Sequence, residues 1–242
     1  MNNDCNALFG YPLEFAGLCK IYPPKVKDVL CTPNYDAYSH LLTLRQEDIE
    51  DEFTLNDIDL AQVLSPLEYL LNNAFHLPQF KQLALDAFKF FIHEDVYFNY
   101  MQKQILIGNL ESLESIRILD DSNYFEFQNV VREALGMPPA VLPDENEDPR
   151  IKRIKAKARY RDRVKAKEGK TLSFETLLTS ICCMNMGLNP LNIGELSYAA
   201  IPKLIARYEA QESYHLSIDS ILAGADSKKV KPKYWIRNLE EN

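Results

Sequence analysis

The sequence predicts a mainly helical α+β protein with one small β element. Three observations favour this class. Apolar residues recur at spacings of three and four along much of the 242-residue chain, which is the period of an amphipathic helix. The chain contains only 8 glycines, few for the tight turns of a multi-stranded β protein. Because 46% of its residues are hydrophobic and 11% aromatic, it can bury enough apolar surface to fold.

The first thirty residues predict a pair of short extended pieces followed by a helix. The extended pieces fall within residues 11–21, because the prolines at 23 and 24 keep the backbone before them extended. A short helix follows from Lys25, with Pro24 suited to its first turn. Its apolar residues are Val26, Val29 and Leu30.

Three further helices are predicted between residues 34 and 91. Residues 34–43 hold tyrosine and leucine side chains at helical spacing. Ser65 followed by Pro66 is typical of a helix N-cap with proline at the first helical position, and this helix extends to Ala74. Pro78 opens the next helix, whose residues 80–91 present one apolar face.

An acidic run separates the first two of these helices, and an apolar run at positions 55, 58, 61 and 64 follows it. The run lacks the glycine and the ligand spacing of a calcium-binding loop. We therefore predict a solvated acidic face. Its members are Glu47, Asp48, Glu50, Asp51 and Glu52.

The periodicity changes between residues 94 and 118. Val96, Phe98 and Tyr100 alternate with other side chains, and residues 104–109 form a β-rich run that ends in a turn signal. These patterns predict a small hairpin or sheet.

A helix over residues 124–135 comes next, after the capping sequence Asp121-Ser122-Asn123. Gly136 supplies its stop. The side chains predicted to be buried on this helix are Phe125, Val130, Val131 and Leu135.

The best boundary in the chain is the proline-rich and then acidic stretch at residues 137–149, which cannot sustain a helix or a sheet. Arg150–Lys170 follows with eleven bases and two acids, a net charge of +9 in a chain of net charge −8. We therefore predict three parts. Residues 1–136 form a mainly helical domain with the small β element, residues 137–170 a linker and a basic connector helix, and residues 171–242 a small helical region.

The C-terminal region predicts two helices and a tail. Ser173 opens a helix over residues 176–186, and Gly187 closes it. A longer helical run has Pro202 near its start and ends at Gly224. The tail that follows is basic, with Tyr234 and Trp235 side by side.

Five of the best-specified enzyme motifs are absent from the sequence. GxGxxG, GxxxxGK[ST], HExxH, GxSxG and an EF-hand loop are all missing. His93-Glu94-Asp95 is the one group that could bind a metal or move protons, but adjacent side chains point apart, which favours a helix-end cluster.

Cysteine spacing and hydropathy favour a cytosolic protein. The five cysteines lack the spacing of a zinc site, which is typical of reduced thiols in a cytosol. No apolar run approaches the roughly 20 residues that cross a bilayer, and none has the form of a signal-peptide core.

The basic segment Arg150–Lys170 has two interpretations. Its bases could follow the phosphates of a nucleic acid, with steep salt dependence. Alternatively, the alanines and isoleucines between the bases indicate one exposed helix with a thin apolar stripe, which could connect two modules or dock on an acidic surface of this chain or of a partner. The second interpretation is favoured. Its predicted contact residues are Arg153, Lys157 and Arg161.

Short segments at both ends of the chain match a known family. At the start these are residues 8–13 and 21–29, and at the end residues 195–198, 212–214, 221–225 and 231–235. They resemble proteins encoded in the tail-morphogenesis gene clusters of long-tailed bacteriophages and prophages. The chain is similar to tail assembly chaperones, which coat the aggregation-prone tape measure protein before the tail tube polymerises around it. Residues 101–123 match no motif of the family.

This resemblance implies a non-catalytic chaperone without a cofactor in the bacterial host cytoplasm. Its partner would be the tape measure protein, and it could also self-associate into oligomers. A long helix with apolar stripes needs a helical groove, which the apolar face of residues 176–222 would provide. The predicted partner contacts are Ile181, Leu204, Tyr208 and Ile221 on this face, together with Tyr234 and Trp235 of the tail.

Several alternatives stay open beside this interpretation. The apolar side chains of residues 176–222 could be ordinary core. The protein could be a nucleic-acid-binding accessory protein that acts through residues 150–170, a small enzyme, or a structural component of the tail.

Overall fold

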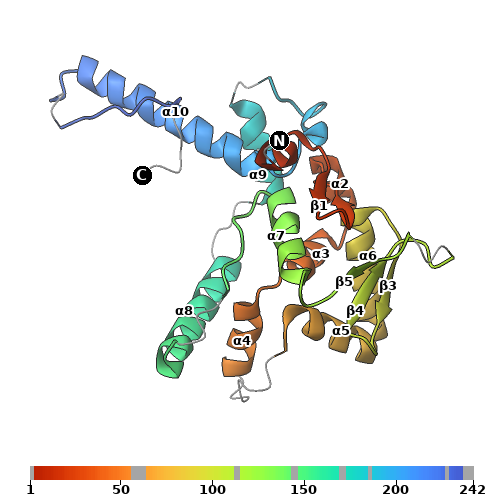
Figure 1. Cartoon of the computed structure of the whole chain (residues 1–242). Coiled ribbons are helices and arrows are strands. Elements are labelled where there is room, and N and C mark those ends of the chain that lie inside the picture. Colours follow the sequence, from red (N-terminus) through yellow and green to blue (C-terminus); the bar gives the residue numbers. More distant parts are fainter. Residues whose placement is uncertain are drawn as a thin grey trace.

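Helices form most of the structure, and two small antiparallel sheets complete it, so the predicted α+β class is confirmed. The computed structural model describes residues 3–55, 64–111, 115–142, 147–168, 173–184, 187–226 and 229–236. Figure 1 shows a body of helices and sheets, one helix along its edge and one long helix projecting from it. No helix in these described ranges combines the length and the apolarity needed to cross a membrane.

The chain begins with a short helix and a β-hairpin. Helix α1 (Asn3–Phe9) leads into strands β1 (Leu13–Phe15) and β2 (Cys19–Ile21), which pair antiparallel. The extended pieces predicted within residues 11–21 are therefore confirmed. The Cys19 thiol lies inside the body, where burial and then Glu94 raise its pKa to about 12.

Two helices follow the hairpin. Helix α2 (Val26–Cys31) is capped by Lys25, whose backbone N–H donates to the Asp28 carboxylate over 3.0 Å. Pro24 therefore precedes the cap and does not lie in the first turn as predicted. Helix α3 (Tyr35–Leu42) confirms the helix predicted over residues 34–43.

The next three helices are α4 (Gln46–Leu55), α5 (Pro66–His76) and α6 (Pro78–Ile92). The Ser65 hydroxyl accepts a hydrogen bond from the Glu68 backbone N–H at 3.1 Å, which confirms the predicted cap. The predicted apolar positions 58 and 61 lie outside the described residues. The buried side of α6 consists of Ala84, Ala87, Phe88, Phe91 and Ile92.

The second sheet confirms the β element predicted between residues 94 and 118. Strands β3 (Val96–Asn99), β4 (Gln104–Ile107) and β5 (Arg117–Leu119) pair antiparallel in that order.

Helix α7 (Tyr124–Ala134) lies close to the first hairpin. Val131 and Leu135 are buried as predicted, whereas Phe125 and Val130 are only partly buried. The prediction missed the most deeply buried aromatic residues of this helix, Tyr124 and Phe127. After α7 the chain stays against it, because Arg132 Nε donates to the Pro138 carbonyl and the Ala140 N–H donates to the Asn129 amide oxygen, both at 2.8 Å.

The last four elements are α8 (Pro149–Glu168), α9 (Phe174–Cys183), the short 3₁₀ helix η3 (Ile193–Glu195) and α10 (Ala200–Leu222). The predicted basic helix is confirmed as α8. Helix α9 ends at Cys183, earlier than the predicted residue 186, and α10 agrees with the predicted long run. A second apolar cluster forms here from Val26, Leu178, Ile181, Ile193 and Ile201.

Residues 195–199 join the C-terminal region to the start of the chain. The Val26 N–H donates to the Leu196 carbonyl, and the Tyr198 N–H donates to the Pro24 carbonyl, both at 2.9 Å. The Ser197 hydroxyl donates to the Ala7 carbonyl at 2.7 Å. Because Val26 also belongs to the second apolar cluster, the two ends of the chain share a core.

Gly136 lies at this joint, and we expect its replacement by alanine to lower the free energy of unfolding by about 2 kcal/mol. Its φ is +70°, and an added Cβ would lie 2.9 Å from the Ala199 carbonyl oxygen. The matched control is Gly187→Ala, where φ is +73° but no atom lies within 4 Å. The control should lower the free energy of unfolding only by the cost of placing alanine at a positive φ, about 1 kcal/mol. Urea denaturation of both variants measures the difference, and equal losses would contradict the close contact.

Glu195 carries two ion pairs across the same joint, and we expect Glu195→Gln to lower the melting temperature at neutral pH. Its carboxylate accepts from Lys25 at 2.7 Å and from Lys27 at 2.5 Å. These hydrogen bonds lower the pKa of Glu195 from 4.5 to about 2. A lowered folded-state pKa stabilises the protein above the ordinary value, and this contribution is lost as pH falls towards 2.

Thermal melts of the wild type and of Glu195→Gln between pH 7 and pH 3 measure this effect. The gap between the two should narrow below pH 4.5 and should also shrink in high salt, because the pairs are exposed. The exposed Glu212→Gln serves as the control. A gap that is independent of pH would argue against these ion pairs as its source.

Candidate partner-binding surfaces

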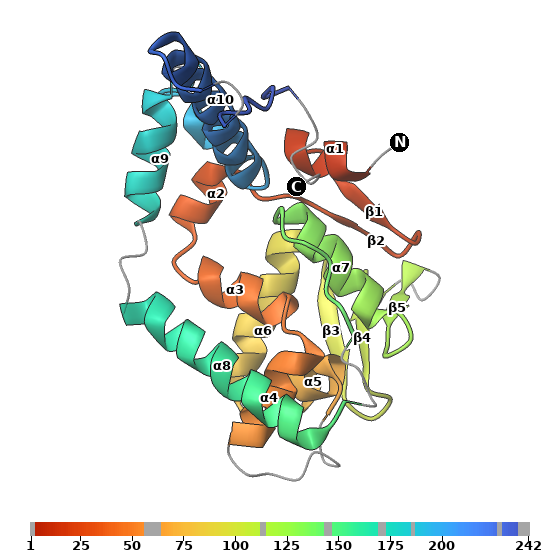
Figure 2. The ribbon, with the colours of Figure 1, turned by 90° about the vertical axis from the view of Figure 1, so that its left-hand side faces the viewer.

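The basic helix α8 packs against the acidic helix α4 (Figures 1 and 2). Arg159 donates two hydrogen bonds to the Asp51 carboxylate, from Nε at 2.7 Å and from a terminal nitrogen at 2.5 Å. The Asp51 side chain is only 4% exposed. This contact, opposed by burial, raises the pKa of Arg159 above its usual value. The two helices are therefore held together by a bidentate and largely buried ion pair.

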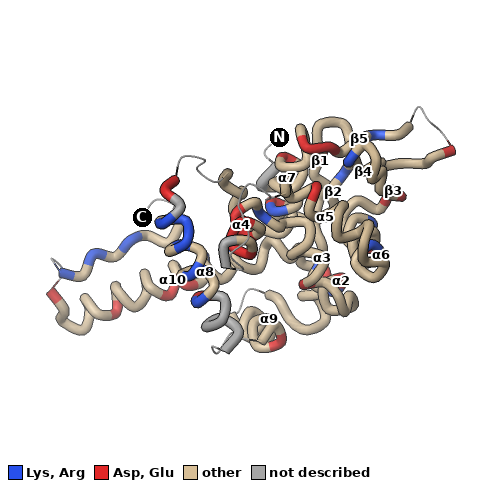
Figure 3. The backbone as a smooth tube through the Cα atoms, turned by 90° about the horizontal axis from the view of Figure 1, so that it is seen from below, with Lys and Arg blue, Asp and Glu red and all other residues tan. Residues whose placement is uncertain are grey.

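Weaker contacts extend this interface along both helices. Lys152 Nζ lies 3.7 Å from the Glu50 carboxylate, and Arg159 lies 4.0 Å from Glu47. Ile49 of α4 and Ala156 of α8 are both almost fully buried, yet neither belongs to the two core clusters. Figure 3 shows the acidic residues of α4 and the basic residues of α8 along the tube.

The prediction of a solvated acidic face at residues 47–52 is thus wrong. Asp51 is buried, and Glu47 and Glu50 face the bases of α8. The Arg159–Asp51 bond joins residues 108 positions apart, a separation at which no local pattern reveals the partner. One of the predicted options for the basic segment, docking on an acidic surface of this chain, is what the structure contains.

The opposite side of α8 is exposed and also basic. Arg150, Arg153, Lys157 and Arg161 follow one another at spacings of three, four and four residues, which places them on one face. All four side chains are exposed, including the three predicted contact residues Arg153, Lys157 and Arg161. We call this row the outer face of α8. The predicted segment continues to Lys170, but the side chains of residues 163–170 lie outside the described part.

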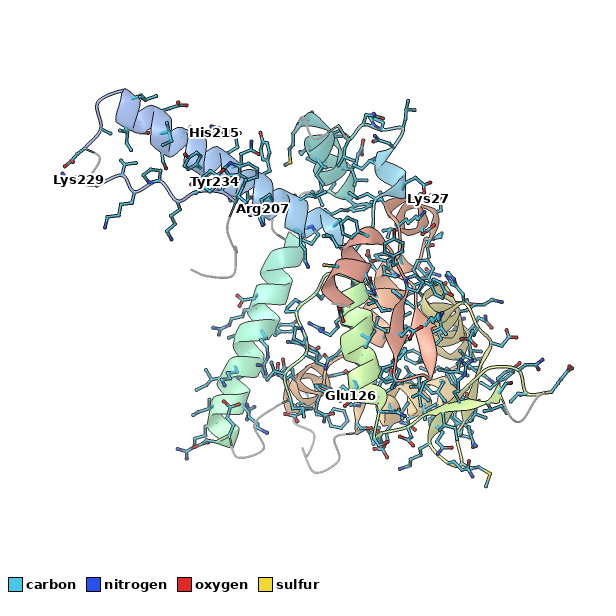
Figure 4. All side chains as sticks on the ribbon, turned by 45° about the horizontal axis from the view of Figure 1, so that its top comes forward. Lys27, Glu126, Arg207, His215, Lys229 and Tyr234 are labelled. Atoms are coloured by element: carbon cyan, nitrogen blue, oxygen red, sulfur yellow. The ribbon has the colours of Figure 1, made fainter. Side chains whose placement is uncertain are left out.

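The second surface is an arm made of α10 and the tail (residues 229–236). The helix projects beyond the body, and the tail returns along it (Figures 1 and 4). Arg207 donates to the Trp235 carbonyl at 2.6 Å, and the rings of Tyr214 and Tyr234 meet edge to face with centroids 5.5 Å apart. A hollow beside the helix is lined by Leu216 and by Val230 of the tail.

The structure places the predicted apolar contacts in different environments. Ile181 is fully buried in the second apolar cluster, so the core interpretation holds for it. Leu204, Tyr208, Ile221 and Trp235 are partly buried, and the Tyr234 side chain is exposed. These last five lie on the arm.

Sequence reasoning missed the most exposed apolar residues of the arm. Leu216 is 64% exposed and Leu222 80% exposed, and Ile236 of the tail is also exposed. Leu216 and Leu222 share the helical period of the other apolar residues of α10. Their exposure therefore depends on the course of the tail, which runs along one side of the helix. No pattern within α10 itself carries that signal.

The group His93-Glu94-Asp95 does not form a common binding site. The His93 ring stacks on Tyr22 with centroids 4.2 Å apart, while Glu94 pairs with Arg117. His93 takes a φ of 60° at the C-cap of α6, which is the helix-end role that the sequence favoured. In the described part of the chain no three metal-ligating side chains come together.

Comparison with known proteins gives one match. Residues 165–240 match the family model of the YomV second domain, a phage-type family, so this part of the chain is phage-related. The matched range includes α9, η3, α10 and the tail. No curated protein and no solved structure matches the chain.

Proposed function

We propose that this phage-related protein is a tail assembly chaperone that binds the tape measure protein and keeps it soluble during tail morphogenesis. In this proposal the protein is not an enzyme, acts in the cytoplasm of the bacterial host and uses the arm as its binding surface. Short segments at both ends resemble tail assembly chaperones, and the phage-type family match covers the arm.

The observation that carries the proposal is the arm's exposed apolar surface. Leu216, Leu222, Tyr234 and Ile236 are all exposed on an element that projects from the body. Isolated exposed apolar side chains are ordinary on a protein surface, but several on one projecting element mark an interaction site. A long amphipathic helix, such as a tape measure protein provides, would bury its own apolar stripe against such a surface.

The test is co-expression with the tape measure protein, followed by pull-down of the complex at 50 mM and 500 mM salt. Capture through apolar contacts should persist at high salt and should keep the partner in the soluble fraction. Leu216→Ser combined with Leu222→Ser should reduce the captured amount. The matched control is Leu191→Ser, which changes a leucine that is 96% exposed but lies before α10.

Three outcomes would overturn this proposal. They are failure to capture the partner, equal capture by the arm variant and the control, and loss of the complex at high salt. Purified virions separate the chaperone from a structural tail component, because a chaperone leaves the assembled tail and a structural component stays in it.

A further inference from the structure

The inner side of helix α8 shows which kind of partner its basic residues can bind. Its inner side carries Lys152, Ala156 and Arg159, and an acidic helix of the same chain lies against them. Acidic side chains meet the two bases, and the small side chain of Ala156 is buried between the helices. The structure thus contains an acidic helix that binds this type of surface through ion pairs and an apolar contact.

The outer face of α8 repeats the chemistry of the inner side. Its row of bases includes Arg150, Lys157 and Arg161 at helical spacing, and the isoleucine Ile154 lies among them with 68% of its surface exposed. By charge complementarity this face fits an acidic partner. The exposed isoleucine adds an apolar contact that a helix with an apolar stripe can bury.

We propose that the outer face of α8 binds an acidic amphipathic helix of a protein partner. A nucleic acid fits less well, because its phosphates would leave the exposed Ile154 without an apolar contact. The outer face is separate from the arm, so this proposal does not depend on the tape measure protein.

The probe is a fluorescein-labelled peptide with the sequence of residues 45–55, which contains all five acids of α4. Its binding to the full chain is followed by fluorescence anisotropy at 50 mM and 150 mM salt. A second peptide, in which glutamine and asparagine replace the acids, shows the contribution of charge. A labelled single-stranded DNA 20-mer is tested in parallel.

The test variant is Lys157→Glu with Arg161→Glu. Both residues are exposed on the outer face, so the inner contact with α4 stays intact. The matched control, Lys81→Glu with Lys89→Glu, makes the same change of charge on the exposed side of α6. Circular dichroism verifies that both variants keep their helix content.

We expect the acidic peptide to bind the wild type and the control, and to bind the test variant about tenfold more weakly. The neutral peptide should bind weakly to all three. Equal binding of the acidic peptide to the test variant and the control, or no binding to the wild type, would overturn the proposal. Binding of the DNA through Lys157 and Arg161 in preference to the peptide would overturn it in favour of nucleic acid. The arm variants should bind the peptide normally, which separates this result from the chaperone test.

Discussion

Replacing Arg159 with methionine is expected to lower the free energy of unfolding by about 3 kcal/mol. Methionine keeps much of the aliphatic stem but removes the guanidinium, so the nearly buried Asp51 carboxylate loses its bidentate partner. The effect falls at the low end of the range for buried pairs, because the Arg159 side chain is 31% exposed. Urea denaturation followed by circular dichroism measures the loss.

Hydrogen exchange shows where this loss acts. In the Arg159→Met variant, amides of α8 and α4 should exchange faster than those of α6, because the interface opens before the core does. Arg161→Met is the control, since it removes the same group from the outer face and should change stability little. Adding Asp51→Asn to Arg159→Met should recover part of the stability, because no unpaired charge is then buried. Equal losses in Arg159→Met and Arg161→Met would refute the interface as described.

Phe127→Ala is expected to lower the free energy of unfolding by about 3–5 kcal/mol. The Phe127 side chain is fully buried, and its ring lies 5.7 Å from that of Phe88 and 5.9 Å from that of Phe15, centroid to centroid. The substitution therefore opens a cavity where the first hairpin, α6 and α7 meet. Chemical denaturation of the full chain measures the loss.

The matched control for Phe127 is Phe75→Ala, which removes a mostly exposed ring on α5. This variant should stay within about 1 kcal/mol of the wild type, because little area is returned to water. A result in which the two variants lose similar stability would contradict the packing of α7 at the centre of the core.

Local signals explain the parts of the fold that could be predicted. The Ser65 cap, the stop at Gly136 and the period of α6 each act over a few residues, and the sequence alone therefore placed those elements. The basic character of α8 was equally evident. On α7, by contrast, Phe125 and Phe127 are aromatic residues two positions apart. Only packing against Phe15 and Phe88 decided that Phe127 enters the core.

For the candidate surfaces, the sequence determined which segments carry charge or apolar side chains, and tertiary structure decided which of these side chains stay exposed. The bases of α8 divide between a side paired with the acids of α4 and an outer face, and the apolar residues of α10 divide between the buried Ile201 and the exposed Leu216 and Leu222. In both helices, the exposure of a side chain depends on a segment that is distant along the chain or that folds back over the helix. Electrostatic and apolar contacts form between residues that are close in space. A pattern along the chain therefore shows which side chains a helix carries, whereas the neighbouring elements of the fold decide which of these side chains stay exposed.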